Sequence, residues 1–332
     1  MSEGYLVPVQ ELADHAGPGI EEPGLEVATE LVRRHVGDGL TVLRSEKLYG
    51  GSINRVLRWE TDGEPGYVVA KLNTARSRRA FRGEFDSLRW FGTNTSMPVP
   101  EPIAVLEPDG TGSGYSGSGL LMAWVPGVTL ASARLSERGR AVFESRLAGC
   151  VSELHSHTRS SYGSAVGGES YGAWIECFSP LIHEEYGAVR ESLSSGSREV
   201  IDALLAHLPR YLPERSRPTA THGDLWANNI LVDDAHPDRP VVKALIDGVA
   251  RYCDPEYELA YLTLFRAVGK TFFERYHAVH PKRPGFGFRS RVYWLKTMMR
   301  HVRVFGERYV PSVEALAEEL RRMQPGYVAK LR

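Results

Sequence analysis

The sequence predicts an α+β fold in two lobes, with a small N-terminal lobe built on an antiparallel sheet and a mostly helical C-terminal lobe. Two patterns indicate this fold class. Between residues 41 and 72, three short apolar runs are separated by glycine-rich or polar turns, which is typical of a β-meander. From residue 140 onward, apolar residues recur mainly at helical spacing. We expect residues 1–124 to form the first lobe and residues 125–332 the second, and a chain of 332 residues is long enough for both.

The composition is that of an ordinary globular protein and disfavours several functional classes. Forty basic and 41 acidic residues give a formal net charge of −1, so nucleic-acid binding is not the expected main activity. We find no apolar stretch of membrane-spanning length and no signal-peptide pattern at the N-terminus, and we therefore expect a cytoplasmic protein. The cysteines have no metal-ligand spacing and are expected to be free thiols. They are Cys150, Cys177 and Cys253.

The first N-terminal elements are a helix and a hairpin. Residues 24–36 place apolar side chains on one helical face, and Gly37 ends the helix. Strands are expected at residues 41–48, 56–61 and 67–72. The tip of the turn between the first two strands can approach a ligand closely, because glycine tolerates the required backbone angles. This turn contains Gly50, Gly51, Ser52 and Asn54.

The third strand leads into a helix that carries a possible partner for a lysine. Lys71 lies at the end of this strand, and Glu84 lies within the helix that follows. A lysine at a strand end is usually a solvated charge. A functional role for Lys71 is therefore indicated only by the motifs further along the chain. Prolines at residues 98–102 end the helix. Residues 120–125 then predict a buried strand that enters the Pro126-Gly127 turn.

The C-terminal elements are expected to be mostly helices. Residues 140–155 place Leu147, Val151 and Leu154 on one face, and further helical stretches follow at residues 174–208, 258–309 and 312–323. His155 and His157 end the first of these helices without a third metal ligand nearby, so we expect capping or packing roles for them.

The segment from His222 to Asp247 carries the most specific chemistry in the chain. Asp224 can accept or orient a hydroxyl proton, while Asn229 and Asp247 offer the oxygen ligands that Mg²⁺ prefers. Alone, His-Gly-Asp also fits a tight turn with a solvated carboxylate. Here the apolar residues 230–232 and the mostly apolar run 241–246 flank a polar segment and predict a hairpin that joins Asn229 to Asp247. This order of residues resembles the catalytic loop and metal ligands of protein kinases.

With its other motifs, the chain resembles the aminoglycoside-phosphotransferase-like kinases, and most closely the fructosamine kinase (ketosamine 3-kinase) family. The resemblance covers nearly the whole chain. Its markers are YGGSIN at 49–54, VAKLN at 69–73, HGDLW at 222–226, FFERY at 272–276 and HVRVFGERY at 301–309. It implies a protein-kinase-like fold and transfer of the γ-phosphoryl group of ATP, with Mg²⁺, to a hydroxyl of a sugar-like acceptor that bears an amine.

The same resemblance implies a role for each matching residue. Asp224 would be the catalytic carboxylate, and Asn229 and Asp247 would be the metal ligands. Lys71 would hold the phosphates, with Glu84 as its partner and the glycine-rich turn beside the nucleotide. The strand near residue 122 would be the hinge that binds adenine, and its alternative is an ordinary core strand and turn. The hinge residues are Met122, Ala123 and Trp124.

Departures from the family pattern lie on the acceptor side and leave the substrate open. Asp247-Gly248-Val249 stands where fructosamine kinases usually have Asp-Pro-Ala, and residues 254–258 look more like the antibiotic kinases. An acceptor with an amine would favour carboxylates near Asp224. The candidate acceptor-binding residues are Trp226, Glu176, Glu256 and Glu258. For the three glutamates, the alternative is a solvated or helix-capping carboxylate.

Three functions follow from these patterns. The leading interpretation is an ATP- and Mg²⁺-dependent kinase of a ketosamine, and the second is a kinase of an aminoglycoside or nucleoside antibiotic, for resistance or biosynthesis. The third, from a different class, is a nucleotide-binding regulator without catalysis. The expected partner is a small-molecule acceptor, with neither nucleic acid nor membrane, and the expected state is a monomer or weak homodimer. The choice between ATP and GTP stays open.

Overall fold

The computed structural model describes residue 20 and the ranges 22–48, 54–74, 77–108, 114–213 and 217–331, with side chains up to residue 323. The described residues form two compact units. The sheet unit consists of the described residues up to Phe143 together with Asn228–Val249. The helical unit consists of the described residues of Glu144–Ala227 and Ala250–Arg332. Among the described residues, no helix is both long and apolar enough to cross a membrane.

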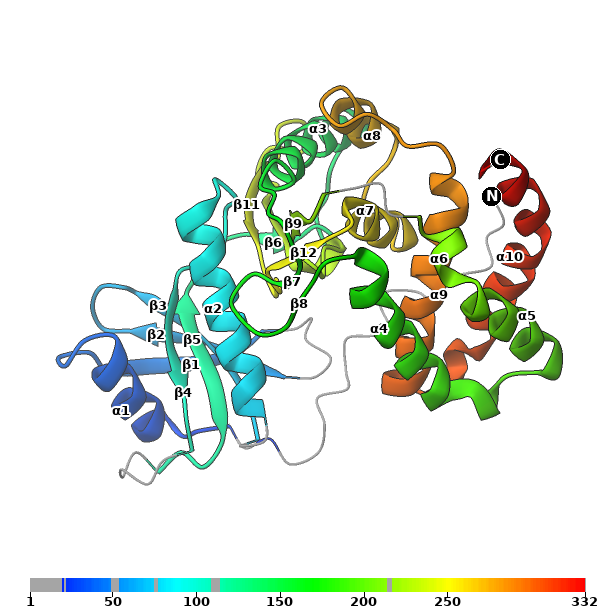
Figure 1. Cartoon of the computed structure of the whole chain (residues 1–332). Coiled ribbons are helices and arrows are strands. Elements are labelled where there is room, and N and C mark those ends of the chain that lie inside the picture. Colours follow the sequence, from blue (N-terminus) through cyan, green and yellow to red (C-terminus); the bar gives the residue numbers. More distant parts are fainter. Residues whose placement is uncertain are drawn as a thin grey trace. The chain divides into compact units, whose positions relative to one another are not determined.

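The sheet unit is built on an antiparallel five-stranded sheet, in the order β1-β2-β3-β5-β4 (Figure 1). Its strands are β1 (Val42–Lys47), β2 (Arg55–Thr61), β3 (Tyr67–Asn73), β4 (Pro102–Leu106) and β5 (Ser118–Ala123). Two helices accompany the sheet, α1 (Leu25–His35) and α2 (Arg78–Asn94). The predicted meander and both predicted helices are therefore present, and β4 is an additional strand.

The two faces of β3 explain how this unit orients its lysine. Side chains alternate across a strand, so Val68, Ala70 and Leu72 point to one face and pack in a core that includes residues of α1. Val69 lies on the opposite face and packs in a second core with Phe81 and Leu88 of α2. The alternation places Lys71 on the face that α2 covers.

A second, three-stranded sheet completes the sheet unit, in the order β11-β10-β6. It consists of β6 (Val128–Thr129), β10 (Ile230–Asp233) and β11 (Val241–Leu245). The predicted hairpin is confirmed, and its register pairs Ile230 with Leu245. The turn of the hairpin contacts the segment before α3 (Glu137–Leu154), where the Arg134 N–H donates to Asp234 Oδ2 at 3.0 Å.

The long helix α9 is the centre against which several helices of the helical unit pack. Besides the larger part of α3, its helices are α4 (Trp174–Val189), α5 (Ser195–Ala206), α6 (Leu208–Tyr211), α7 (Pro255–Leu264), α8 (Lys270–His277), α9 (Phe286–Phe305) and α10 (Val310–Leu331). Helices α4, α7 and α10 all pack against α9 (Figure 1). Many residues of α9 are buried. A small sheet in the order β8-β7-β12-β9 lies in the same unit. Its strands are β7 (Tyr162–Ser164), β8 (Ser170–Tyr171), β9 (Thr219–Thr221) and β12 (Arg251–Cys253).

The two compact units do not divide the chain at residue 124. Residues 125–143 and 228–249 belong to the sheet unit, because β6 pairs with β10 and the Leu245 N–H donates to the Pro98 carbonyl at 2.8 Å. The small sheet was also not expected, since strands of two or three residues are too short to reveal a period-two pattern.

Candidate active site

A buried lysine joins two carboxylates in the sheet unit. Lys71 Nζ lies 2.9 and 3.0 Å from the two carboxylate oxygens of Glu84, so the predicted contact is confirmed. It also donates to Asp247 Oδ1 at 2.8 Å, a direct contact that the sequence did not predict. Burial disfavours the charged lysine, but the carboxylates of Asp247 and Glu84 outweigh this and raise the pKa of Lys71 above its ordinary value. The lysine is therefore a fixed positive charge.

The hairpin brings the two predicted metal ligands to one end of the same small sheet. Ile230 pairs with Leu245, so Asn229 and Asp247 both lie just beyond this last pair. The Ile246 N–H donates to the Asn229 carbonyl at 2.9 Å and fixes this arrangement. Asp247 has a φ of 61°, in the left-handed region, which turns the chain sharply after β11.

This donor set fits Mg²⁺ bound to phosphate. Mg²⁺ commonly takes one or two protein oxygens and completes its octahedron with waters and phosphate oxygens, and here the protein offers one amide and one carboxylate. The described ranges contain no group of three or more His, Cys, Asp or Glu side chains arranged to hold a metal ion. Asn229 and Asp247 are therefore suited to a metal that arrives with a nucleotide.

A cavity of about 320 Å³ adjoins these residues in the sheet unit. Lys71, Asn229 and Asp247 line its polar part. Its apolar walls come from Leu48, Val56, Val69, Met122, Leu231 and Ile246. This size and lining are those of a small-molecule site, apolar with a few convergent polar groups.

The predicted hinge residues line the same cavity. Met122, Ala123 and Trp124 all contribute to its wall. The Ala123 N–H already donates to the Glu101 carbonyl at 2.8 Å, so this group is not available to a ligand. Asn54, just before β2, accepts a hydrogen bond from the Asn73 side chain at 2.7 Å. The predicted ligand-binding residues Gly50, Gly51 and Ser52 lie outside the described residues.

The predicted catalytic carboxylate belongs to the helical unit and is held by a tyrosine. Asp224 follows Gly223, whose φ of 86° requires a residue that tolerates the left-handed region. The Tyr261 hydroxyl, on α7, donates to Asp224 Oδ1. Burial and the neighbouring Asp224 carboxylate raise the pKa of Tyr261 well above its ordinary value, so the phenol keeps its proton and acts as a donor.

A second residue of α7 fixes the backbone of the Asp224 loop. Glu258 is 2% exposed and accepts the Gly223 N–H at 2.8 Å. It also lies 3.3 Å from His155 Nε2. Burial opposes its charged form, but the hydrogen bond from His155 together with the nearby His222 holds the pKa of Glu258 below its ordinary value. Glu258 is thus a structural anion behind the loop, which corrects its predicted role in contacting the acceptor.

The other two glutamates expected near the acceptor are also engaged elsewhere. Glu256 is 4% exposed, and Arg289 and Arg283 occupy both of its carboxylate oxygens at 2.5 to 3.0 Å. Glu176 is exposed and accepts the Ala173 N–H at 3.1 Å, so it caps the start of α4. The alternative of a helix-capping carboxylate is therefore correct for Glu176, while Glu256 is a buried ion-pair partner.

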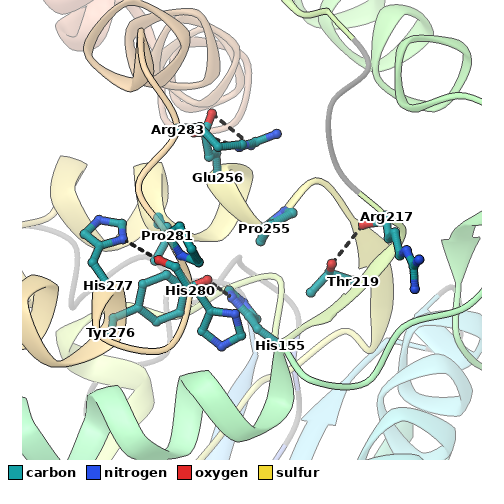
Figure 2. Close-up of a pocket in the computed structure, with 11 residues that line it drawn as sticks. His155, Arg217, Thr219, Pro255, Glu256, Tyr276, His277, His280, Pro281 and Arg283 are labelled. Carbon is teal, nitrogen blue, oxygen red and sulfur yellow. Dashed lines mark hydrogen bonds and ion pairs between the residues drawn. The ribbon is translucent and has the colours of Figure 1, made fainter.

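A smaller cavity of about 200 Å³ lies in the helical unit, beside His155 and Glu256 (Figure 2). Several polar side chains around it already have hydrogen-bond partners. His155 Nδ1 lies 2.7 Å from the Tyr276 hydroxyl, and His277 Nδ1 lies 2.9 Å from the His280 carbonyl. The Arg283 side chain donates to Glu256, as Figure 2 shows. His155 is accordingly a packed residue, as the sequence predicted.

Aromatic side chains extend from Asp224 along the helical unit. Trp226, another predicted acceptor residue, is half-buried, and its ring centroid lies 5.7 Å from that of Phe265. The Phe265 ring in turn lies 4.9 Å from that of Tyr261. Sequence reasoning missed Tyr261 and Phe265, although Asp254 and Pro255 are a strong helix start and place Glu258 and Tyr261 three residues apart on one face of α7.

The comparisons with known proteins agree on one family. The family model described as "Phosphotransferase enzyme family" matches residues 46–294. A protein named "Probable ketoamine kinase" from Synechocystis sp. is 24% identical over 310 residues, which cover 90% of this chain and 97% of the relative.

Solved structures share the fold. A protein from Haemophilus somnus named "Putative fructosamine-3-kinase" superposes with a TM-score of 0.70 at 20% identity, covering 88% of this chain and 96% of that chain. The GDP complex of an aminoglycoside 2'-phosphotransferase-IIIa variant gives a TM-score of 0.64 at 16% identity, covering 92% and 100%. The predicted kinase-like α+β fold is confirmed by these likenesses.

Proposed function

Because this chain belongs to the phosphotransferase enzyme family, we propose that it transfers the γ-phosphoryl group of ATP to a hydroxyl of a small ketosamine. The observation that carries the proposal is the ion-pair cluster of Lys71, Glu84 and Asp247 at the wall of an apolar cavity of about 320 Å³. An enzyme of phosphoryl transfer mainly needs fixed charges around the phosphates and a positioned acceptor.

The sheet unit supplies the nucleotide-binding residues. The apolar walls of the cavity suit a purine base, and Lys71 offers its fixed charge to phosphate oxygens. Asn229 and Asp247 would hold Mg²⁺, which when bound neutralises charge on the phosphates. Lys71 already contacts the Asp247 carboxylate directly. A Mg²⁺ ion that arrives with the nucleotide therefore competes with the Lys71 ammonium for this carboxylate.

The helical unit supplies the acceptor-binding residues. Asp224 aligns the acceptor hydroxyl and receives its proton, which is the role of a positioned general base. Tyr261 and Glu258 do not react; they hold the Asp224 carboxylate and its loop. The proposal of a ketosamine acceptor rests on the relative named as a ketoamine kinase, which aligns along 90% of this chain.

The test is acceptor-dependent formation of ADP from ATP and Mg²⁺. We would screen ketosamines, aminoglycosides and nucleoside antibiotics, and repeat each active pair with GTP and with an Asp224→Ala variant. Selective turnover of a ketosamine that disappears in the variant supports the proposal. Turnover of an antibiotic alone assigns the chain to resistance or biosynthesis, and nucleotide binding without any turnover favours a regulator.

A further inference from the structure

A buried lysine that forms no ion pair with any described side chain lies in the helical unit. Lys296, on α9, is 8% exposed, and its Nζ donates to the Tyr257 hydroxyl at 3.2 Å. The ammonium also lies 5.9 Å from the centre of the Tyr257 ring. No carboxylate of the described residues forms an ion pair with Lys296.

This arrangement is costly unless a ligand completes it. A buried ammonium loses its favourable hydration free energy. A hydrogen bond to a phenol and contact with an aromatic ring compensate for only part of this loss. Two nearby arginines of this unit are paired: the buried Arg289 contacts Glu256, and the half-buried Arg283 contacts both Glu256 and Asp254. Lys296 therefore differs from its neighbours in lacking an anionic partner.

A second cation strengthens the positive field at this place. Arg300 lies four residues further along α9, so it shares a face with Lys296. Its guanidinium is half exposed and lies 3.5 Å from Glu185, but Glu185 is already bound by Arg303 at 2.6 and 2.9 Å. One carboxylate thus serves two arginines. Burial, followed by the charges of Arg300 and Lys296, lowers the pKa of His301 below its ordinary value.

These cations are connected to the proposed catalytic carboxylate through α7. Tyr257 and Tyr261 lie four residues apart, on one face of α7, and α7 packs against α9. Tyr261 donates to Asp224, and Tyr257 accepts from Lys296. Both tyrosines are half-buried, so each keeps part of its side chain exposed.

From this arrangement we infer that the acceptor carries a carboxylate, and that Lys296, assisted by Arg300, binds it. The inference rests on the proposed kinase function and narrows its substrate class to ketosamines formed from amino acids. The amine of the acceptor needs no protein carboxylate in this scheme, since Glu256 and Glu258 are occupied elsewhere. A polycationic aminoglycoside does not suit a site with these two cations.

The experiment compares two acceptors that differ only in the carboxylate. One is fructosyl-glycine, the ketosamine formed from glucose and glycine, and the other is fructosyl-methylamine, the ketosamine formed from glucose and methylamine. We would measure kcat and KM for both with the wild-type protein, Lys296→Met and Lys296→Arg. The matched control is Lys270→Met, which removes a lysine that is 88% exposed on α8 of the same unit.

We expect the wild-type protein to prefer the glycine ketosamine by about tenfold or more in kcat/KM, as one charge-assisted contact allows. Lys296→Met should raise KM for the glycine ketosamine to the wild-type KM for the methylamine ketosamine. The same variant should leave kcat and KM for the methylamine ketosamine within about twofold of the wild-type values. Lys296→Arg should retain part of the preference, and Lys270→Met all of it.

Two results would overturn the inference while the proposed function stands: equal use of both ketosamines by the wild-type protein, or a parallel loss for both acceptors in Lys296→Met. Turnover of neither ketosamine by a protein that phosphorylates another acceptor would instead contradict the proposed function, and the inference would fail with it.

Discussion

At the scale of single residues, Asp224 depends on two side chains of α7. Tyr261 donates to its carboxylate, and Glu258 binds the N–H of Gly223, the residue before it. Sequence reasoning identified Asp224 from its motif but missed Tyr261, which is 37 residues away and lies in no motif. By contrast, Lys71 and Glu84 were predictable as a pair because only a short connection separates their strand and helix.

Removing the Tyr261 hydroxyl should slow catalysis without weakening nucleotide binding. In Tyr261→Phe the Asp224 carboxylate loses one donor, and a hydrogen bond to a charged group contributes about 1.5–3 kcal/mol, so kcat should fall about tenfold or more. KM for ATP should not change. The control is Tyr171→Phe, whose hydroxyl donates to the exposed Glu169. If kcat is unchanged, or if KM for ATP rises in step, Tyr261 does not position the catalytic carboxylate.

Glu258 gives the helical unit a pH-dependent contribution to stability. Its pKa is lower in the folded protein than in the unfolded chain, so its stabilising effect is present above its ordinary pKa and is lost as the pH falls through the lower, folded value. Glu258→Gln should therefore reduce the free energy of unfolding by about 1–3 kcal/mol at pH 7.

The difference between wild-type protein and Glu258→Gln should shrink as the pH falls below about 4.5, where the unfolded chain becomes protonated. Urea unfolding at a series of pH values measures it. A difference that stays constant between pH 7 and pH 4 would contradict the proposed state of this carboxylate.

At the scale of elements, the hairpin β10–β11 carries Asn229 and Asp247 and is held by the start of α3. A Cβ added to Gly139 would lie 1.7 Å from the Pro237 carbonyl in the hairpin turn, so only glycine permits this contact. The hairpin itself was predictable from its two apolar runs. Its docking on α3 was not, because that contact joins segments that are about a hundred residues apart.

Gly139→Ala should displace the hairpin and lower both stability and affinity for Mg²⁺ and nucleotide. Overpacking of this kind costs about 1–3 kcal/mol. The matched control on the same helix is Gly149→Ala, where a Cβ meets nothing within 4 Å and should stabilise by about 0.5–1 kcal/mol. Urea unfolding and nucleotide titration would measure both variants, and equal behaviour of the two would refute the role of the contact.

At the scale of the whole molecule, the sequence predicts the fold class and the reaction more completely than the acceptor. The helices and strands of this fold have long apolar patterns, and the reacting residues lie in short motifs. Both features can be recognised in the sequence directly. Which charged side chains can bind the acceptor depends on which carboxylates already form ion pairs with neighbouring residues. Glu256 seemed available from its place in the chain, but Arg289, 33 residues later, occupies it. The same kind of distant packing leaves Lys296 as the cation that a carboxylate could bind.

In the proposed function, residues of the sheet unit bind the nucleotide and Asp224 of the helical unit aligns the acceptor. The most direct test measures kcat and the Kd for Mg²⁺–ATP in Asp224→Asn and in Asp247→Asn. We predict that Asp224→Asn lowers kcat by about 10²–10⁴ and leaves Kd within about twofold, whereas Asp247→Asn weakens binding of Mg²⁺–ATP. Wild-type turnover in Asp224→Asn, or a loss of nucleotide affinity as large as the loss of rate, would contradict this division of roles.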